Sequence, residues 1–351
     1  MSSSDKSKDL FDLLPDIPRK GRGAVSNKQG RYEVHQKYNV DDGWADLTQD
    51  AEELPSLCTK ISVDQSKTIL TKNNSPDIPF VQSINPYRGC EHGCIYCYAR
   101  PTHAWLGLSP GLDFESHLWI KPEAPELLAK AFSKKNYKPI PITLGANTDP
   151  YQPIEKKYEI TRNILKVLSD FNHPFALITK SSLVLRDLDL LQPMGNQGLV
   201  KVYLSITTLN AKLARLMEPR AATPNKRLKT VEELIKANVP TGVLMAPIIP
   251  GLNDIEIEDI LSTVAKLGVQ DVGYVLLRLP HEIKDLFQEW LQVHYPLKAK
   301  RILTLIRETR GGYLNDPNFG QRMVGTGVYA QMIAKRFKLA EKKFGLVTKR
   351  F

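Results

Sequence analysis

Three of the four cysteines lie close together in the stretch NPYRGCEHGCIYCYARP. Cys90, Cys94 and Cys97 follow the spacing Cys-x3-Cys-x2-Cys, and an odd number of thiols does not suit a disulfide framework. Three thiolates on one loop can hold a metal centre that keeps one coordination position open. Two centres fit this pattern: an iron–sulfur cluster with one open iron, or a zinc ion with His92 or His103 as the fourth ligand. The sequence favours the cluster.

The remaining cysteine and the overall composition indicate in which cellular compartment the protein is expected. Cys58, in the stretch ELPSLCTKI, is predicted to be a small buried residue rather than a ligand. Four cysteines in 351 residues, three of them clustered, indicate a reducing compartment, so a cytoplasmic location is expected. No apolar run has the length of a membrane span, and the first residues do not resemble a signal peptide.

Short runs rich in β-branched residues alternate with helical patterns from residue 80 onward. Six strands are predicted, at 80–85, 140–146, 175–180, 199–206, 241–249 and 271–279, with helices at 124–135, 156–171, 183–194, 229–238 and 254–268. Strands that are separated by crossover helices form a parallel sheet. The sequence therefore predicts an α/β fold, a partial (β/α)6 TIM-like barrel with an N-terminal extension and C-terminal helices. A doubly wound open sheet is the alternative.

Three segments are expected along the chain. Residues 1–79 form an N-terminal extension, frayed over about its first 20 residues; residues 80–280 form the barrel; and residues 281–351 form a C-terminal helical segment with a basic tail. Within the extension, residues 19–33 (RKGRGAVSNKQGRYE) could bind an anion through backbone amides or form a loose arm. The loose arm is the favoured interpretation.

The cysteines directly follow the first predicted strand, and other polar residues follow the later strands. In parallel α/β barrels the chemistry takes place at the C-terminal ends of the strands. The polar residues that we expect at this rim are Asn147 and Asp149 after the second strand, Lys180 after the third, Ser205 after the fourth and Arg278 after the sixth.

The stretch GCEHGCIYCYA resembles the signature of the radical SAM superfamily, Cys-x3-Cys-x-aromatic-Cys, and the resemblance extends over the predicted barrel. Within that superfamily, the stretches YCYA and NTDPYQPIE look most like the spore photoproduct lyase-like branch. Together with KGRGAVSN near the N-terminus, they are similar to its uncharacterised Rv2578c-type radical SAM proteins.

The resemblance implies a [4Fe–4S] cluster on the three cysteines and S-adenosylmethionine (SAM) on the fourth iron. It implies reductive cleavage of SAM to a 5′-deoxyadenosyl radical that abstracts hydrogen from a substrate. It also implies that Tyr96 lies against the adenine, that Asn147 or Asp149 serves the amino group, and that Lys180 and Ser205 contact the carboxylate and the ribose. An electron donor such as flavodoxin or ferredoxin is the implied redox partner.

Tyr98 is the catalytic candidate, because the corresponding tyrosines of spore photoproduct lyases help to return a hydrogen atom. Those enzymes also use a cysteine after the second strand, and this chain has Ala146 there. The hydrogen-return relay is therefore incomplete, which puts repair of thymine dimers in doubt.

The chain carries a net charge of +10, which suits an anionic partner such as nucleic acid. A solvated surface with excess lysine explains the charge as well. Three functions follow: radical chemistry on nucleic acid by repair or modification, the same chemistry on a protein or metabolite, or a zinc- or cluster-bearing nucleic-acid-binding module without turnover.

Overall fold

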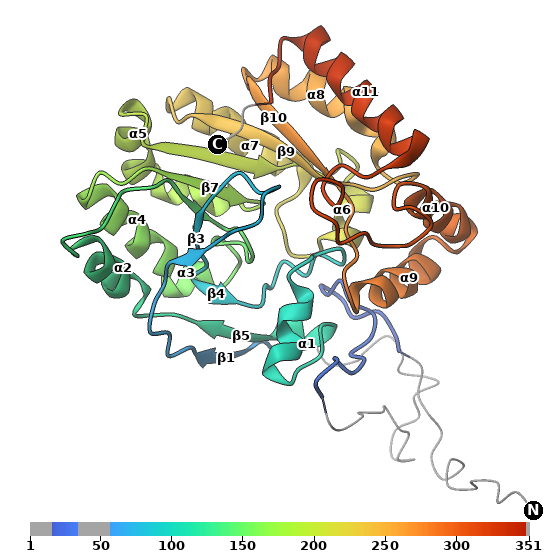
Figure 1. Ribbon diagram of the computed structural model, residues 1–351, viewed down its shortest axis with the longest axis horizontal. Helices are drawn as coiled ribbons and strands as arrows, with labels where there is room; N and C mark the ends of the chain where they lie inside the picture. The colour runs from blue at the N-terminus through green and yellow to red at the C-terminus, as the bar shows by residue number, and fades with distance from the viewer. Residues whose placement is uncertain (1–15, 34–56, 349–351) are drawn as a thin grey trace, which may run out of the picture.

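The computed structural model describes residues 16–33 and 57–348, and its main feature is a seven-stranded sheet (Figure 1). The sheet has the order β10-β9-β8-β7-β6-β3-β2, in which the first six strands are parallel and β2 is antiparallel at the edge. The strands are β2 (Thr71–Lys72), β3 (Gln82–Ile84), β6 (Ile142–Leu144), β7 (Phe175–Thr179), β8 (Val200–Ser205), β9 (Thr241–Ile248) and β10 (Asp271–Leu276).

The six predicted strands and the partial barrel are confirmed. The parallel strands follow one another in sequence order across the sheet, without the reversal of strand order that a doubly wound fold requires. The central strands β6, β7 and β8 are short runs that are largely buried on both faces, which is why their sequences read as continuous rather than alternating. Within the described residues no strand pairing joins β10 to β2, so the barrel is open.

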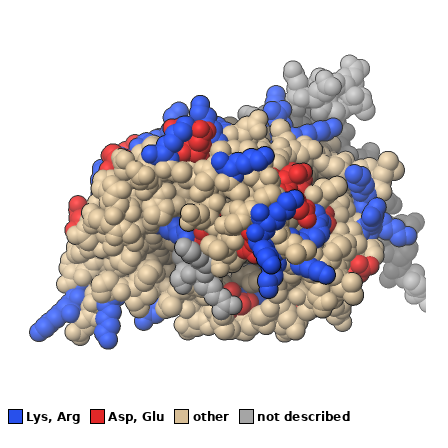
Figure 2. Space-filling view, turned by 90° about the horizontal axis from the view of Figure 1, so that it is seen from above, with Lys and Arg blue, Asp and Glu red and all other residues tan. Residues whose placement is uncertain are grey.

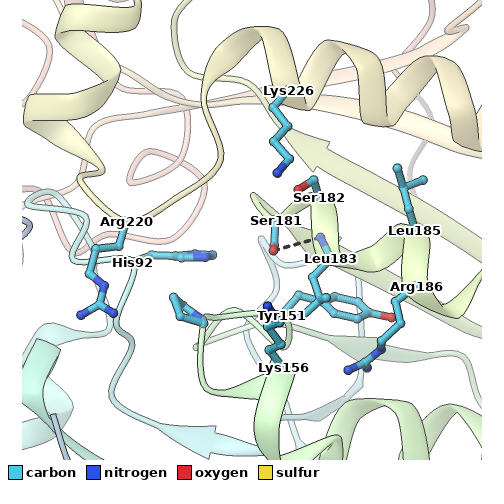
Figure 3. Close-up of a pocket in the computed structure, with 11 residues that line it drawn as sticks. His92, Tyr151, Lys156, Ser181, Ser182, Leu183, Leu185, Arg186, Arg220 and Lys226 are labelled. Carbon is cyan, nitrogen blue, oxygen red and sulfur yellow. Dashed lines mark hydrogen bonds between the residues drawn. The ribbon is translucent and has the colours of Figure 1, made fainter.

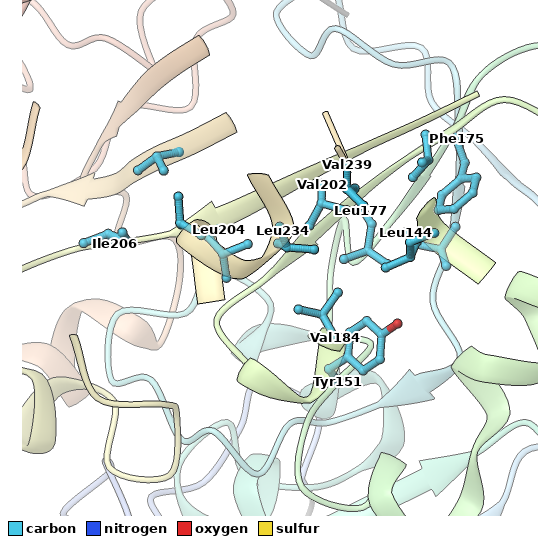
Figure 4. Close-up of a cluster of buried hydrophobic side chains, with 14 of the residues drawn as sticks. Leu144, Tyr151, Phe175, Leu177, Val184, Val202, Leu204, Ile206, Leu234 and Val239 are labelled. Atoms are coloured by element: carbon cyan, nitrogen blue, oxygen red, sulfur yellow. The ribbon is translucent and has the colours of Figure 1, made fainter. Parts of the chain in front are cut away.

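The helices that connect the strands pack their apolar faces onto the sheet. They are α2 (Ala124–Phe132), α3 (Glu155–Tyr158), α4 (Ile160–Asp170), α5 (Leu188–Asn196), α6 (Ala211–Met217), α7 (Pro224–Lys236) and α8 (Ile257–Lys266), with 3-10 turns η2 (Ser182–Asp187) and η3 (Asp254–Glu256). In α4, Ile160, Ile164 and Leu168 recur at helical spacing and are buried. Figure 4 shows the resulting core, in which Leu144, Leu177, Val202, Val184 and Leu234 lie together.

Two predicted helices are divided, and the connection after β8 contains a short helix that was missed. The predicted helix 156–171 is broken at Glu159, which has a left-handed backbone with φ 50°. The break is stabilised by Glu155, whose carboxylate accepts hydrogen bonds from the amides of Thr161 at 2.9 Å and Arg162 at 3.2 Å in the first turn of α4. The predicted helix 183–194 is η2 followed by α5, and the short helix α6 was not predicted.

A second sheet lies beside the cysteine segment and was also missed. It has the order β1-β5-β4, with strands β1 (Lys60–Val63), β4 (Tyr87–Arg88) and β5 (His117–Ile120). β1 has four residues, all of them exposed, and β4 has two, so both are too short to give a clear strand signal in the sequence. The helical segments η1 (Arg100–Leu106) and α1 (Leu112–Ser116) lie between β4 and β5.

Three helices follow the barrel: α9 (Ile283–His294), α10 (Pro296–Glu308) and α11 (Gly327–Phe344). The first two build a second core with Ile95, Met217 and Trp290, and the indole N–H of Trp290 donates to the carbonyl of Leu216 at 3.1 Å. Helix α11 packs against α8 (Figure 1). Of the helices in the described part of the chain, none combines the length and apolar character of a membrane span.

Residues 311–326, between α10 and α11, form a strap along the edge of the open sheet. The amide of Leu276, at the end of β10, donates to the carbonyl of Met323 at 2.9 Å. Arg322 donates to both carboxylate oxygens of Asp77, at 2.7 and 2.5 Å. Asp77 lies in the connection between β2 and β3, so this ion pair joins the two edges of the sheet.

Candidate active site

The three clustered cysteines lie on one loop at the C-terminal end of the parallel strands, between β4 and η1. Cys90 and Cys94 are buried, Cys97 is partly exposed, and all three are free thiols. Burial raises the pKa of the Cys90 thiol well above its ordinary value, and Asp149 and the other two cysteines add to the effect. Burial likewise raises the pKa of Cys94 to about 12. Thiolates at these positions therefore require a strongly positive partner such as a metal cluster.

A fully buried arginine fixes the path of this loop. The Arg100 guanidinium donates to the carbonyls of Cys94 at 2.9 Å and Gly93 at 3.0 Å, and to those of Pro110 and Gly111 at 3.1 and 2.9 Å. It also pairs with the buried carboxylate of Glu115 at 2.5 Å. Arginine suits this position because its planar group presents five donors in a fixed geometry.

The N-terminal arm is packed beneath the cysteine loop, so the loose-arm interpretation is wrong. The backbone amides of Gly23 and Ala24 each donate at 2.9 Å to the Glu115 carboxylate, and the Arg22 side chain donates to the Glu115 carbonyl at 2.6 Å. The anion that these amides bind is therefore a carboxylate of the protein itself, that of Glu115. A Cβ on residue 23 would overlap the carbonyl oxygen of Gly93, so only glycine allows this approach.

The loop after β6 holds the cysteine loop from the other side. Gln152 accepts from the amide of Glu91 at 2.9 Å and donates to the carbonyl of Gly89 at 3.1 Å. The Asp149 carboxylate lies 3.2 Å from the imidazole Nδ1 of His92. Sequence reasoning missed Gln152, Arg100 and Glu115, because their partners lie far away in the chain or are backbone atoms.

Asp149 is engaged by protein donors on both carboxylate oxygens. It accepts from the amide of Tyr151 at 2.9 Å, the Thr179 hydroxyl at 2.7 Å and the amide of Lys180 at 2.8 Å. Although burial disfavours its charge, His92 and these donors hold the pKa of Asp149 down, at about 2. The backbone amide of the neighbouring Asn147 donates to Asn85 at 2.9 Å, and its side chain makes no hydrogen bond with any residue that the structure describes.

Tyr96, Lys180 and Ser205 meet around a buried ion pair. The Tyr96 hydroxyl donates to Glu218, which also pairs with the fully buried Arg227. Arg227 donates to the backbone carbonyl of Ser205 at 2.9 Å. The Lys180 ammonium lies 5.8 Å from the centre of the Tyr96 ring and makes no ion pair or hydrogen bond with any described residue. These three predicted cofactor residues therefore lie in one neighbourhood beside Cys94.

Tyr98 and Arg278 form a second pair at the same rim. The Tyr98 hydroxyl donates to the carbonyl of Ala146, and the residue is 48% exposed. The Arg278 guanidinium lies 5.7 Å from the centre of that ring. In the described structure Arg278 makes no ion pair, and its one side-chain hydrogen bond reaches the Met323 sulfur at 3.8 Å. An unneutralised arginine beside an accessible aromatic ring can bind an anion.

The zinc alternative is not supported. Among residues 16–33 and 57–348, no three His, Cys, Asp or Glu side chains are placed to hold a single metal ion. His103 is buried and its Nε2 contacts the His117 carbonyl at 2.9 Å. A cluster presents a separate iron to each thiolate, so its ligands need not converge on one point as zinc ligands must. Cys58 is exposed, so its prediction as a buried residue is wrong, and it lies just before β1.

Comparisons with known proteins agree with this geometry. The family described as the radical SAM superfamily matches residues 84–264. The uncharacterised protein Rv2578c of Mycobacterium tuberculosis is 32% identical over 243 residues, which cover 69% of this chain and 71% of that protein. The uncharacterised protein MJ0683 of Methanocaldococcus jannaschii is 33% identical over 173 residues, or 49% of this chain and 62% of that protein.

Solved structures of spore photoproduct lyase have the same fold. The lyase complexed with dinucleoside spore photoproduct matches with a TM-score of 0.54 and 16% identity, over 81% of this chain and 77% of that chain. A variant with bound AdoMet and dinucleoside spore photoproduct matches with a TM-score of 0.54 and 15% identity, over 85% and 88%. At these identities the likeness concerns the fold alone.

Proposed function

This chain belongs to the radical SAM superfamily, and on that premise we propose that it cleaves SAM reductively with a [4Fe–4S] cluster and abstracts hydrogen from a nucleic acid. The observation that carries the proposal is the loop of Cys90, Cys94 and Cys97 at the C-terminal end of a parallel barrel. When bound, a cluster on three cysteines supplies an open iron for SAM and the electron that cleaves it.

The protein's own residues would bind and orient SAM. Lys180 offers a free, partly buried ammonium to the carboxylate, and a charged donor is the strongest partner for that group. Tyr96 provides a ring for the adenine, and its hydroxyl is held by Glu218. The Asn147 side chain is free within the described structure to accept from the SAM amino group. Ser205 is the candidate for the ribose.

Asp149 has a different role in this proposal from the one its position in the sequence suggested. Both of its carboxylate oxygens are already used by Thr179, Lys180 and neighbouring donors. We therefore assign Asp149 to the positioning of Lys180 and of His92 on the cysteine loop. In this assignment Asp149 acts on SAM through these two residues and does not contact it.

The substrate class rests on charge at the mouth of the barrel. Arg278 and Tyr98 together offer a cation and an aromatic face, which is the combination that binds a phosphate and a base in single strands. Lysine and arginine side chains also gather in several groups on the face seen in Figure 2. Tyr98 would be the catalytic residue that lies against the substrate. Because residue 146 is alanine, the reaction would differ from that of spore photoproduct lyase in how hydrogen is returned.

Two measurements test the proposal. Anaerobically reconstituted protein treated with dithionite and SAM should release 5′-deoxyadenosine, and an intact cluster without this product would favour a binding module. Affinity for a single-stranded oligonucleotide should fall steeply with salt, with a log–log slope of about −2 or steeper if three or more phosphates are contacted. Arg278→Met should weaken this binding about tenfold. An oligonucleotide affinity that does not change with salt would exclude nucleic acid as the substrate and favour a protein or metabolite.

A further inference from the structure

A pocket of about 490 Å³ opens beside the cysteine loop (Figure 3). It is bounded by the cysteine loop, the loop before α3, the turn η2 and the start of α7. Its polar lining comes from His92, Tyr151, Lys156, Ser181, Ser182, Arg186, Arg220 and Lys226, and its apolar lining from Pro153, Leu183 and Leu185. Among the described residues no aspartate or glutamate lines it, so the charged groups that they place at its surface all have one sign.

Two of its four permanent cations are free to meet a partner. Lys156 and Lys226 are exposed and pair with no carboxylate of the described chain. Lys226 extends from the first turn of α7 toward Ser182 (Figure 3). Arg220 is exposed and lies 3.3 Å from Glu91, whereas Arg186 is neutralised by Glu155 and Asp187. The pocket therefore presents an excess of positive charge.

One wall of the pocket is the outer surface of the cysteine loop. His92 lies between Cys90 and Cys94 in sequence, and its carbonyl accepts from the amide of Arg220 at 3.4 Å. The Arg220 side chain pairs with Glu91 on the same loop. The lining includes none of the residues assigned to SAM or to the substrate, namely Tyr96, Tyr98, Asn147, Lys180, Ser205 and Arg278. A partner in this pocket would approach the cysteines without entering the barrel mouth.

We propose that this pocket is the docking site of a small acidic electron-carrier protein, of the flavin or iron–sulfur class; the inference rests on the proposed function. Each cleavage of SAM consumes one electron: the carrier is oxidised by one electron, one carbon–sulfur bond of SAM breaks, and methionine and a 5′-deoxyadenosyl radical result. Electron transfer weakens steeply with distance, so the carrier must dock near the cysteine loop. Complementary charge guides and orients such an encounter.

The location favours a carrier over a nucleic acid at this site. The Tyr98–Arg278 pair, which the proposed function assigns to the substrate, is absent from the pocket lining. The pocket instead touches the loop that would hold the electron acceptor. Separate sites would allow the carrier to bind while SAM and substrate occupy the barrel.

The test reverses the two free charges. The full-length variant Lys156→Glu/Lys226→Glu is compared with Lys335→Glu/Lys338→Glu, which makes the same charge change on two exposed lysines of α11. The probe is purified flavodoxin. Its dissociation constant is measured by calorimetry at low and high salt, and 5′-deoxyadenosine formation is driven either by reduced flavodoxin or by dithionite, without substrate.

The pocket variant should bind flavodoxin at least about tenfold more weakly at low salt, and the difference should shrink at high salt. Its ratio of flavodoxin-driven to dithionite-driven cleavage should fall by a similar factor, whereas the α11 variant should match the wild type. Unchanged affinity and ratio in the pocket variant would overturn the inference. So would a loss of oligonucleotide affinity with normal flavodoxin binding.

The failure of the proposed function gives a different result. In that case dithionite produces no 5′-deoxyadenosine from the wild type, whereas the calorimetric comparison still decides whether flavodoxin docks in the pocket. Dithionite-driven cleavage by the variant also shows that it has folded.

Discussion

At the scale of single residues, the cysteine loop depends on buried charged groups. Arg100 binds four carbonyls and the Glu115 carboxylate, and Glu115 in turn binds the amides of Gly23 and Ala24. The cysteines could be predicted because their spacing is local. Glu115 could not, because its partners in the arm are more than 90 positions away in the chain. Long-range pairing of this kind leaves no periodicity in the sequence.

His103 provides a pH-dependent test of this region. It is fully buried against Phe114 and Trp119, and burial lowers its pKa from 6.5 to about 4. Since the folded pKa lies below the unfolded one, the neutral ring stabilises the fold fully above about pH 6.5. This contribution, about 3 kcal/mol, should be lost as the pH falls from 6.5 toward 4.

The measurement is the free energy of unfolding in urea between pH 7 and 4.5, together with the NMR titration of the His103 ring. His103→Gln keeps a donor for the His117 carbonyl but cannot titrate, so its stability should depend less on pH by about this amount. A ring that titrates near pH 6.5 in the folded protein would contradict the account.

At the scale of elements, some strands and helices leave a recognisable pattern in their own sequence, and others depend on contacts elsewhere in the structure. The six barrel strands were predictable because each is an apolar run followed by a helical period. The strands β1 and β4 were not, since one is fully exposed and the other has two residues. The break in the predicted helix 156–171 could not be predicted from the sequence either, because it depends on the Glu155 side chain, which caps α4.

The arm makes a prediction at Gly23. In Gly23→Ala the new methyl would overlap the Gly93 carbonyl, so backbone must shift, and such overpacking costs about 1–3 kcal/mol. We expect urea denaturation to show this loss of stability, and hydrogen exchange at the amides of Gly23 and Ala24 to become faster.

Gly21→Ala is the matched control in the same arm. Unlike Gly23, Gly21 has a left-handed backbone, with φ 74°, and no atom of the described chain lies within 4 Å of the position that a methyl group would take there, so only backbone strain is added. If the amides of Gly23 and Ala24 exchanged as slowly in Gly23→Ala as in Gly21→Ala, the packed arm would be refuted.

The strap makes a prediction at Asp77. Hydrogen bonds from Arg322 lower the pKa of Asp77 below its ordinary value of 3.8. The ion pair should therefore stabilise the fold fully above about pH 5, and this contribution should disappear as the pH falls through the folded pKa. Asp77→Asn should cost about 2 kcal/mol at pH 7 and progressively less below pH 4, as measured by urea unfolding.

Arg322→Lys is the companion variant, because it keeps the charge and loses the two-pronged geometry. It should retain part of the stability that Asp77→Asn loses. A cost of Asp77→Asn that is the same at pH 3 and pH 7 would show that the charge of Asp77 does not stabilise the strap.

At the scale of the whole molecule, the proposed sites lie at different places around the open barrel. The cysteine loop lies at the C-terminal ends of the strands, the Tyr98–Arg278 pair lies on the same rim, and the basic pocket lies against the outside of the loop. The barrel and the cysteines could be anticipated from sequence. The pocket could not, since it gathers residues from four separate segments whose charges look unremarkable in the chain.

The central claim is that three cysteines hold an iron–sulfur cluster with one iron open to SAM. The most direct test is the iron and sulfide content of anaerobically prepared protein, with electron paramagnetic resonance of the reduced form before and after SAM is added. The account predicts four irons and four sulfides in the proposed cluster and a spectrum that changes with SAM. A single zinc without labile sulfide would contradict it, as would a cluster whose spectrum ignores SAM.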